Sequence, residues 1–218
     1  MATLYKVHPE TPQLRKIETI REALQKGAVV LYPTDTVYAI GCDLNSKTAV
    51  QRVRQLKQIA NEKPLTFLCS SLSHISDYAV VDDSAYRILK RLVPGPYTFL
   101  LPATKLVPKL VMNPKRRTTG IRVPDHPICQ ALLEALGHPI ISTSSLSVAL
   151  PSGQPNLATL SKAVLFDRLE GLVDVIIDDG DELTYDVSTI LDFTEGEPTL
   201  VRQGLGYEKA LNWGVERV

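Results

Sequence analysis

Hydroxyl and carboxylate side chains directly follow an apolar run near the start of this sequence. In LYPTDTVYAIGCD (31–43), the apolar run stops at Pro33 and is followed by Thr34, Asp35 and Thr36. Two interpretations stay open. Pro ends a strand, and Asp and Thr bond nearby backbone, so the triplet suits a simple turn. It also suits a corner whose hydroxyls face a ligand at the end of a strand.

Polar residues stand at the ends of other predicted strands as well. They are Thr118 with Arg122, Ser142 with Ser144, Ser188 with Thr189, and Arg202. Hydroxyls beside guanidinium groups suit a phosphate or a carboxylate, although ordinary capping residues would give the same pattern. The sequence holds no Ser-His-Asp order, no paired-carboxylate signature and no obvious activated Cys. It therefore favours binding and electrostatic stabilisation over a covalent nucleophile.

The elements that must position these residues alternate between helix and strand. Helical apolar spacing predicts helices at 17–26, 47–59, 84–93 and 126–137, with another near 157–169. Apolar runs predict strands at 28–32, 65–69, 97–103, 119–124, 139–144, 173–177, 187–193 and 198–203. PSGQPN (151–156) is typical of a loop. The short late connections between strands predict one α/β domain with a mixed sheet.

The net charge is zero, but the charges are distributed unevenly. Residues 47–122 carry fourteen Lys and Arg against four Asp and Glu, whereas residues 123–218 carry five against fifteen. A basic region of this kind can meet the phosphates of a nucleic acid. The alternative is that the two regions neutralise each other across the fold.

Composition excludes several classes of protein. No apolar run approaches the ~20 residues of a membrane span, and the N-terminus lacks the apolar core of a signal peptide. The three cysteines form no C-x-x-C pair, and the four histidines lack ligand spacing, so we expect packing or surface roles for them. Neither G-x-G-x-x-G nor G-x-x-x-x-G-K-[ST] is present. These features predict a reduced, cytoplasmic protein with no membrane partner and no metal held by its own side chains.

Six stretches in order along the chain identify a family. They are YPTDTVYAIGCD (32–43), KPLTFLC (63–69), GPYTFLLPAT (95–104), TTGIRVPDHP (118–127), PIISTSSLS (139–147) and STILDF…LVRQG (188–204). The spacing of P-T-D-T-x-Y-x-x-G and G-x-R-x-P-x-H-P is the specific signal. From about residue 12 to about 206, the chain resembles the YrdC/YciO family, whose best-known members are threonylcarbamoyl-AMP synthases.

The resemblance implies a fold and a reaction. The expected fold is a single α/β domain over 1–218 with a twisted mixed sheet of the YrdC/RibB type and a positively charged concave cleft. The expected reaction joins L-threonine, bicarbonate and ATP into threonylcarbamoyl-AMP and pyrophosphate, as a nucleotidyltransferase acting in tRNA modification and translation. Two anions must meet, so cationic side chains and Mg²⁺ carried with ATP would stabilise the charge.

The family pattern also implies residue roles. Lys57 and Arg122 would be catalytic. The substrate would contact Thr34, Thr36, Thr118, Ser188 and Thr189. The nucleotide would contact Lys57, Lys63, Ser142, Ser144 and Arg202. The local basic charge also predicts that tRNA or double-stranded RNA binds at Arg52, Arg54, Lys115, Arg116 and Arg117.

This sequence departs from the synthase pattern at two motifs. The K-x-R motif is Lys57-Gln58-Ile59, and the S-x-N motif is Ser144-Ser145-Leu146. Losing a charged hydrogen bond costs roughly 1.5–3 kcal/mol, so two additive losses would lower activity about a thousandfold. The substitutions resemble the YciO branch. Three hypotheses follow: a synthase of reduced activity, an RNA-binding protein without the chemistry, and the same chemistry on a different amine or acceptor.

Overall fold

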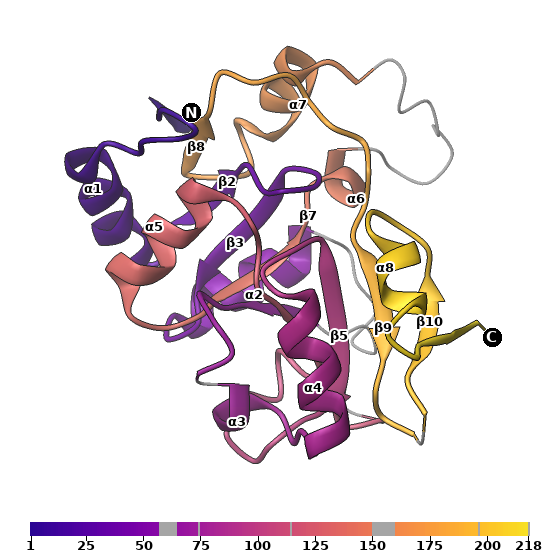
Figure 1. Ribbon diagram of the computed structural model, residues 1–218. Helices are drawn as coiled ribbons and strands as arrows, with labels where there is room; N and C mark the ends of the chain where they lie inside the picture. The colour runs from indigo at the N-terminus through magenta and orange to yellow at the C-terminus, as the bar shows by residue number, and fades with distance from the viewer. Residues whose placement is uncertain (57–64, 74, 114, 150–159, 196, 218) are drawn as a thin grey trace. The chain divides into compact units, whose positions relative to one another are not determined.

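The computed structural model describes residues 1–56, 65–73, 75–113, 115–149, 160–195 and 197–217 (Figure 1). Contacts between residues divide the chain into two compact units, each built from two separate stretches. Unit 1 comprises residues 1–59 and 126–185, and unit 2 comprises residues 60–125 and 186–218. The chain therefore passes from unit 1 to unit 2 and back before it ends in unit 2.

Within the part of unit 1 that the structure describes, five strands are neighbours. Their order is β1 (Thr3–Lys6), β8 (Val175–Asp178), β2 (Val29–Tyr32), β3 (Ala39–Asp43) and β7 (Ile140–Ser144). β8 pairs in parallel with β1 and β2, whereas β3 runs antiparallel to both β2 and β7. Every residue of β2 and β3 is buried, which explains why neither strand shows an alternating apolar pattern.

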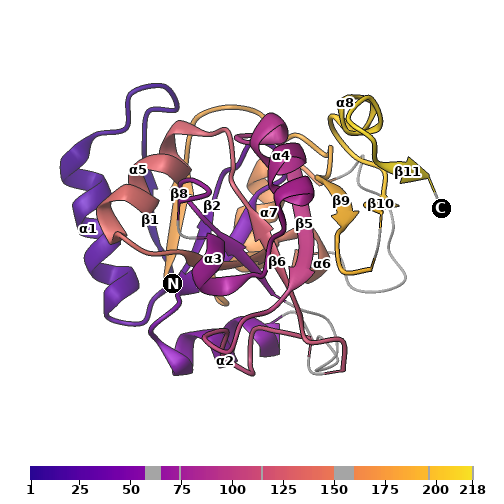
Figure 2. The ribbon, with the colours of Figure 1, turned by 60° about the horizontal axis from the view of Figure 1, so that its bottom comes forward.

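The helices of unit 1 bury one apolar side each. They are α1 (Leu14–Gln25), α2 (Lys47–Leu56), α5 (Pro127–Leu136), the short α6 (Leu146–Ala149) and α7 (Lys162–Leu169). α1 buries Ile17, Ile20 and Leu24, which recur at helical spacing, and it lies beside α5 in both views (Figures 1 and 2). α5 ends at Gly137, whose φ of 72° is left-handed and suits glycine.

The described residues of unit 2 form six neighbouring strands and three helices. The strand order is β4 (Thr66–Leu68), β6 (Thr118–Arg122), β5 (Tyr97–Pro102), β9 (Thr189–Asp192), β10 (Thr199–Arg202) and β11 (Glu216–Arg217). The pairs β4–β6, β5–β9 and β10–β11 are parallel, and β5–β6 and β9–β10 are antiparallel. The helices are α3 (Ile75–Tyr78), α4 (Asp83–Leu92), which lies along β5 in Figures 1 and 2, and α8 (Tyr207–Leu211).

The expected α/β class with a mixed sheet is confirmed. One helix is shorter than predicted, since α7 begins at Lys162 after the capping residue Ser161. The structure describes α2 as far as Leu56, and the predicted helical residues 57–59 lie outside the described part. The predicted loop at 151–156 also lies outside the described residues. The single domain and the concave cleft stay predictions. Within the described residues, no helix has the length and apolarity to span a membrane.

Candidate functional site

In unit 2, the Arg202 guanidinium is held by the residue that precedes β9. Its Nε and Nη2 donate to the Ser188 carbonyl oxygen at 3.1 and 2.7 Å, and Nη2 also lies 3.0 Å from Ser188 Oγ. The Ser188 hydroxyl in turn lies 3.0 Å from Thr98 Oγ1 of β5. Thr98 of β5 and Ser188 before β9 therefore hold the Arg202 guanidinium in place at the end of β10.

A second guanidinium of unit 2 lies close to the first. Arg122 is the last residue of β6 and is buried. Partial burial lowers the pKa of Arg202, and the positive charge of Arg122 lowers it further. Arginine nevertheless stays protonated in proteins, so unit 2 holds two like charges near each other. Such a site favours an anion that neutralises both.

Buried hydroxyls surround this pair. Thr98, Thr118 and Ser188 are all buried, and Thr118 shares a face of β6 with Arg122 because strand residues alternate with a period of two. Gly120 lies between them on the same face, and a Cβ built there would lie 3.0 Å from Thr66 Oγ1 of β4. We name Thr98, Thr118, Arg122, Ser188 and Arg202 the two-arginine site.

Thr189 uses its hydroxyl within unit 2. It is fully buried, and its hydroxyl donates to the Leu205 carbonyl at 2.8 Å and accepts from Gly204 N at 3.1 Å. The hydroxyl therefore holds the turn after β10 against β9, and contact of Thr189 with a substrate stays a prediction. Gly204 was not predicted; a Cβ there would lie 2.3 Å from the Val187 oxygen and 2.6 Å from the Ser188 oxygen.

In unit 1, the Thr34–Thr36 corner forms a turn through its own hydroxyls. Thr34 Oγ1 donates to the Val37 carbonyl at 2.8 Å and accepts from Thr36 N at 3.1 Å. Thr184 Oγ1 donates to the Thr36 carbonyl at 2.5 Å, which ties the corner to the segment after β8. The turn interpretation is confirmed, and contact of Thr34 and Thr36 with a substrate stays a prediction.

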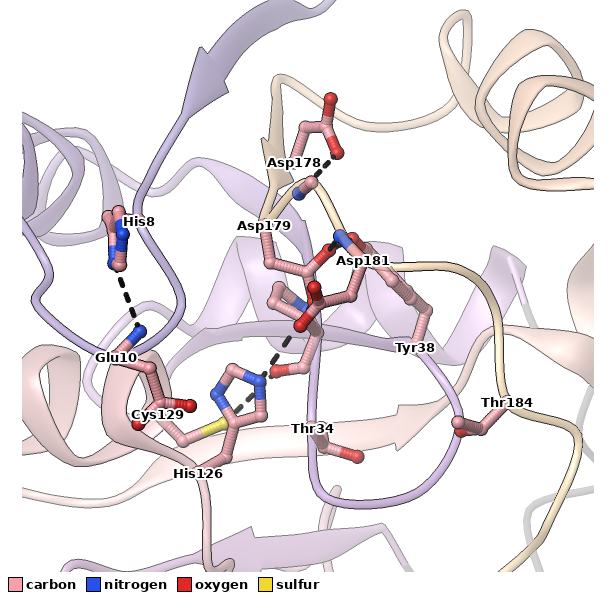
Figure 3. A network of polar contacts seen from close by, with 12 residues as sticks. His8, Glu10, Thr34, Tyr38, His126, Cys129, Asp178, Asp179, Asp181 and Thr184 are labelled. Atoms are coloured by element: carbon pink, nitrogen blue, oxygen red, sulfur yellow. Dashed lines mark hydrogen bonds and ion pairs between the residues drawn. The ribbon is translucent and has the colours of Figure 1, made fainter.

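Beside this corner, unit 1 holds a polar network centred on Asp179 (Figure 3). Asp179 Oδ1 accepts hydrogen bonds from Tyr38 Oη at 2.8 Å, Lys162 Nζ at 2.7 Å and Asp181 N at 3.2 Å. Lys162 Nζ also lies 2.6 Å from Asp178 Oδ1. Burial and then the charge of Asp179 raise the pKa of Tyr38 far above its ordinary value, so the phenol stays protonated and donates.

His126 completes the network on the other carboxylate oxygen. Its Nε2 lies 4.0 Å from Asp179 Oδ2, and both side chains are largely buried. Sequence reasoning placed the histidines in packing or surface roles and missed this pair. The signal that could have found it is the position of His126 in G-x-R-x-P-x-H-P, four residues after Arg122.

The predicted nucleotide residues are only partly described. Ser142 is buried, with its hydroxyl 2.6 Å from Tyr32 Oη. Ser144 Oγ accepts from Leu146 N at 3.3 Å, at the start of α6. Lys57 and Lys63 lie outside the described residues. Contact of these side chains with a nucleotide stays a prediction.

Two of the predicted RNA-binding residues are turned toward the protein. Arg54 is buried, and burial lowers its pKa. Arg52 Nη1 contacts Asp174 Oδ2 at 2.6 Å, and its Nη2 donates to the Leu172 carbonyl at 3.0 Å. Arg52 therefore has two acceptors within unit 1, which a helical face alone does not reveal, and contact of Arg52 and Arg54 with RNA stays a prediction.

The other three predicted RNA-binding residues remain exposed. Lys115, Arg116 and Arg117 precede β6 in a turn where Asn113 Oδ1 accepts from Lys115 N and Arg116 N at 2.9 and 3.0 Å. Arg116 Nη1 approaches Asp192 Oδ2 only at 3.8 Å, with 69% of its side chain exposed. The turn therefore presents consecutive cations to solvent.

Two other features bear on cofactors. A hollow of about 320 Å³ opens beside Asp178 and Asp179, lined also by Lys6, His8 and Lys16, and it contains none of the predicted site residues. Across the described part of the chain, no group of three or more His, Cys, Asp or Glu is arranged to hold a metal ion. No protein ligands can be named for Mg²⁺, and its arrival with ATP stays a prediction.

Comparison with known proteins decides the family. The Sua5/YciO/YrdC family model, described as telomere recombination, matches residues 22–204. This chain belongs to the Sua5/YciO/YrdC family. The resemblance stated from the motifs is thereby confirmed, and the match includes Thr34, Arg122, Ser188 and Arg202.

Within the family, the chain is similar to YciO of Escherichia coli K12. The two are 41% identical over 206 residues, which cover 94% of this chain and 97% of YciO. The crystal structure of E. coli YciO matches with a TM-score of 0.87 and 42% identity over 96% of this chain and 99% of that one. The similarity therefore extends over nearly the full length of both chains.

Similarity extends to named synthases at lower identity. The threonylcarbamoyl-AMP synthase of Vibrio vulnificus is 32% identical over 164 residues, covering 74% of this chain and 84% of that protein. The crystal structure of Pyrococcus abyssi Sua5 complexed with L-threonine matches with a TM-score of 0.84 and 27% identity, over all of this chain and 63% of Sua5. The fold of this chain is thus shared with a protein that binds L-threonine.

Proposed function

We propose that this protein binds ATP with Mg²⁺, L-threonine and bicarbonate, and joins them into threonylcarbamoyl-AMP with release of pyrophosphate. The observation that carries the proposal is the hydrogen-bonded group of Arg202, Ser188 and Thr98 in unit 2, together with the buried Arg122 at the end of β6. The similarity to the Vibrio synthase and to a Sua5 that holds L-threonine supports the choice of substrates. In the cytoplasm, the product would serve the modification of tRNA.

The reaction needs positive charge at two stages. The amine of threonine attacks the carbon of bicarbonate to form a carbamate, and a carbamate oxygen then attacks the α-phosphate while pyrophosphate leaves. Both reacting partners are anions, so their approach is opposed by repulsion. Arg122 and Arg202 would offset that repulsion and stabilise the charge that develops on the phosphate. Mg²⁺ carried with the triphosphate would supply further charge neutralisation.

We expect the proposed turnover to be lower than that of a synthase that carries both the complete K-x-R motif and the complete S-x-N motif. Position 146 carries Leu, which opens α6, where the S-x-N motif would carry Asn. Position 59 carries Ile where the K-x-R motif would carry Arg. Each change removes a polar group, at roughly 1.5–3 kcal/mol for a charged hydrogen bond. We therefore expect turnover about a hundredfold to a thousandfold below that of a synthase with both motifs.

The test is pyrophosphate release by the purified full chain. Release is measured with ATP, Mg²⁺, L-threonine and bicarbonate together, and again with each of them omitted. The proposal predicts release above the buffer blank only in the complete mixture. Release at the rate of the blank in the complete mixture would contradict it. A panel of other amino acids in place of L-threonine separates this reaction from the same chemistry on a different amine.

A second function, binding of tRNA or double-stranded RNA, is favoured by the exposed turn at Lys115, Arg116 and Arg117. Affinity for RNA through these side chains would fall with salt, because each neutralised phosphate releases counterions. Changing all three to Gln should lower the slope of log affinity against log salt by about 2–3. Absence of RNA binding at low salt, or binding that does not change with salt, would exclude this function.

A further inference from the structure

The register of three neighbouring strands in unit 2 places Thr98, Ser188 and Arg202 on one face of the sheet. Thr98 of β5 lies opposite Ile190 of β9, and Ile190 lies opposite Arg202 of β10. Ser188 stands two residues before Ile190, so its side chain shares that face. The pairing of the strands therefore brings two hydroxyls to the guanidinium.

A β-bulge in β10 turns Arg202 to this face. Regular pairing of β10 with β9 holds as far as Leu200. Beyond it, Arg202 rather than Val201 lies opposite Ile190. Without this extra residue, Arg202 would lie opposite Thr189, on the other face of the sheet. Bulges re-aim side chains in this way beside active sites, and here the bulge joins Arg202 to the hydroxyls of the two-arginine site.

Hydrogen bonding limits what the two hydroxyls can offer a ligand. Arginine can only donate, so Ser188 Oγ accepts from Arg202 Nη2 at 3.0 Å. Thr98 Oγ1 lies 3.0 Å from the same oxygen, and one further hydrogen bond joins the two hydroxyls. Two hydroxyls carry two protons, so one O–H proton of the pair has no acceptor among the residues that the structure describes.

Arg202 offers further donors next to these hydroxyls. Its Nε and Nη2 are bonded to Ser188, while the two N–H groups of Nη1 have no acceptor in the described part of the chain. Nη1 shares the carbon Cζ with Nη2, so one ligand group can reach both Nη1 and Ser188 Oγ. Donors without an acceptor suit an oxyanion, which only accepts. The charge of Arg202 draws this oxyanion to Ser188, so Ser188 gives it the remaining O–H proton and Thr98 donates to Ser188.

We propose that Thr98 is a positioning residue, which holds the Ser188 hydroxyl so that Ser188 Oγ and Arg202 Nη1 bind one oxyanion of a substrate. The inference rests on the proposed function, whose substrates supply such a group as a phosphate of ATP or as the carboxylate of L-threonine. Thr98 acts through Ser188. In T98V, which has a similar shape and no hydroxyl, Ser188 can turn to another staggered rotamer and leave Nη2.

The positioning part is tested by NMR of the guanidinium groups in the ligand-free full chain. The rate measured is the rotation of Arg202 Nη2 about its bond to Cζ, and the signal is assigned by its absence in R202Q. We expect rotation about threefold to tenfold faster in T98V, and within about twofold of the wild type in T98S, which keeps the hydroxyl. A purely structural role of Thr98 would lower the free energy of unfolding and leave this rate unchanged.

T119V is the matched control for T98V. Thr119 of β6 is also buried, and its Oγ1 has no hydrogen-bond partner among the described residues. Its loss should therefore leave the rotation of Arg202 Nη2 at the wild-type rate. Unchanged rotation in T98V, or rotation that is equally fast in T119V, would overturn the proposal.

Calorimetric titration with ATP and Mg²⁺, and separately with L-threonine, identifies the source of the oxyanion. The affinity of T98V for the ligand that supplies it should fall about threefold to tenfold, since that is the contribution of one such hydrogen bond. T98S should restore the affinity to within about twofold of the wild type, and T119V should bind both ligands as the wild type does. Wild-type affinity of T98V for both ligands would contradict the proposal.

A double variant shows whether Thr98 acts through Ser188. S188A should weaken the same ligand about tenfold, and T98V/S188A should stay within about twofold of S188A, because Thr98 then has no hydroxyl to hold. Effects of the two changes that multiply would exclude this role. The failure of the proposed function is distinguishable: a wild type that binds neither ATP nor L-threonine would overturn that function, while the rotation of Nη2 in T98V would still decide whether Thr98 positions Arg202.

Discussion

Arg202, the last residue of β10, donates two hydrogen bonds of 3.1 and 2.7 Å to the carbonyl oxygen of Ser188, the residue before β9. Both donors of the fork are used on a backbone atom, so the plane of the guanidinium is fixed by the sheet. The other N–H groups of Arg202 are thereby held in a fixed orientation. A cation held in this way needs little rearrangement when an anion binds, which is the condition for electrostatic stabilisation.

The turn after β10 must contain glycine at position 204 for this arrangement to form. In G204A, the new Cβ would lie 2.3 Å from the Val187 oxygen and 2.6 Å from the Ser188 oxygen. We expect a loss of about 2–3 kcal/mol in the free energy of unfolding, with weaker ATP binding because Ser188 anchors Arg202. G171A is the control, since its Cβ would meet nothing within 4 Å. Urea unfolding measures the free energy of unfolding of both variants, and equal stability of G204A and G171A would refute the role of Gly204.

Restoring the two synthase motifs should restore activity. The single changes I59R and L146N return one polar group each, and each should raise pyrophosphate release about tenfold to a hundredfold. If the two act independently, the double variant should gain about a thousandfold. The comparison uses initial rates at saturating ATP and threonine. A double variant no faster than the wild type would show that other positions limit the reaction.

Lys162 should contribute to stability through Asp178 and Asp179. Its ammonium lies 2.6 and 2.7 Å from the two carboxylates, and K162Q would leave Asp179 buried without its cation. We expect the free energy of unfolding to fall by about 2–4 kcal/mol, with the lower part of the range favoured because Asp178 is partly exposed. K26Q, which removes a cation at 79% exposure, should change stability by less than about 0.5 kcal/mol.

The pH dependence of that contribution has a definite sign. Burial raises the pKa of Asp178, but the hydrogen bonds from Lys162 and Gly180 outweigh it, and the pKa lies below its ordinary value. A carboxyl group of this kind stabilises the fold above its unfolded pKa of about 3.9, and the stabilisation is lost as pH falls through the folded value. The difference between wild type and K162Q should therefore shrink below about pH 4. A difference that grows on acidification would be inconsistent with the network.

The cysteine thiols should be unreactive in the folded protein. All three are buried. Burial, followed by the charge of Asp43, raises the pKa of Cys42 to about 12, and burial raises the pKa of Cys69 to about 12. Since the thiolate is the nucleophile, a disulfide reagent at pH 8 should label none of them in the native state and all three in guanidinium chloride. Rapid labelling of the native protein would contradict the burial.

Sequence reasoning found the elements that have a strong apolar pattern. The helix at α4 and the strands from β5 to β7 were predicted to within two residues, because runs such as SAYRILKRLV and PIISTS combine clear periodicity with Pro or Gly boundaries. β1, β3 and β11 were missed. The TLYK and ER segments of β1 and β11 carry no periodic signal and exist as strands through pairing with β8 and β10. β3 follows the Thr34–Thr36 corner and exists as a strand through pairing with β2 and β7.

Sequence reasoning was less successful for individual side chains at the candidate site. The sequence assigned Ser188 to the substrate and Arg202 to the nucleotide, and it did not predict the hydrogen bond that joins them. The neighbouring Thr189 points to Leu205, because successive strand residues face opposite sides. Arg52 lies on a helix, and no local pattern reveals its acceptors, Asp174 and the Leu172 carbonyl. The pairing of His126 with Asp179 joins residues 53 positions apart, which only the fold brings together.

Calorimetric titration with ATP and Mg²⁺ in the presence of L-threonine tests the two-arginine site most directly. The wild type is compared with R202Q, which removes one of the two guanidiniums, and with R87Q, a change of equal charge on the exposed face of α4. The account predicts that R202Q weakens ATP about tenfold to a hundredfold and that R87Q binds as the wild type does. Equal affinity for ATP in all three proteins would contradict it.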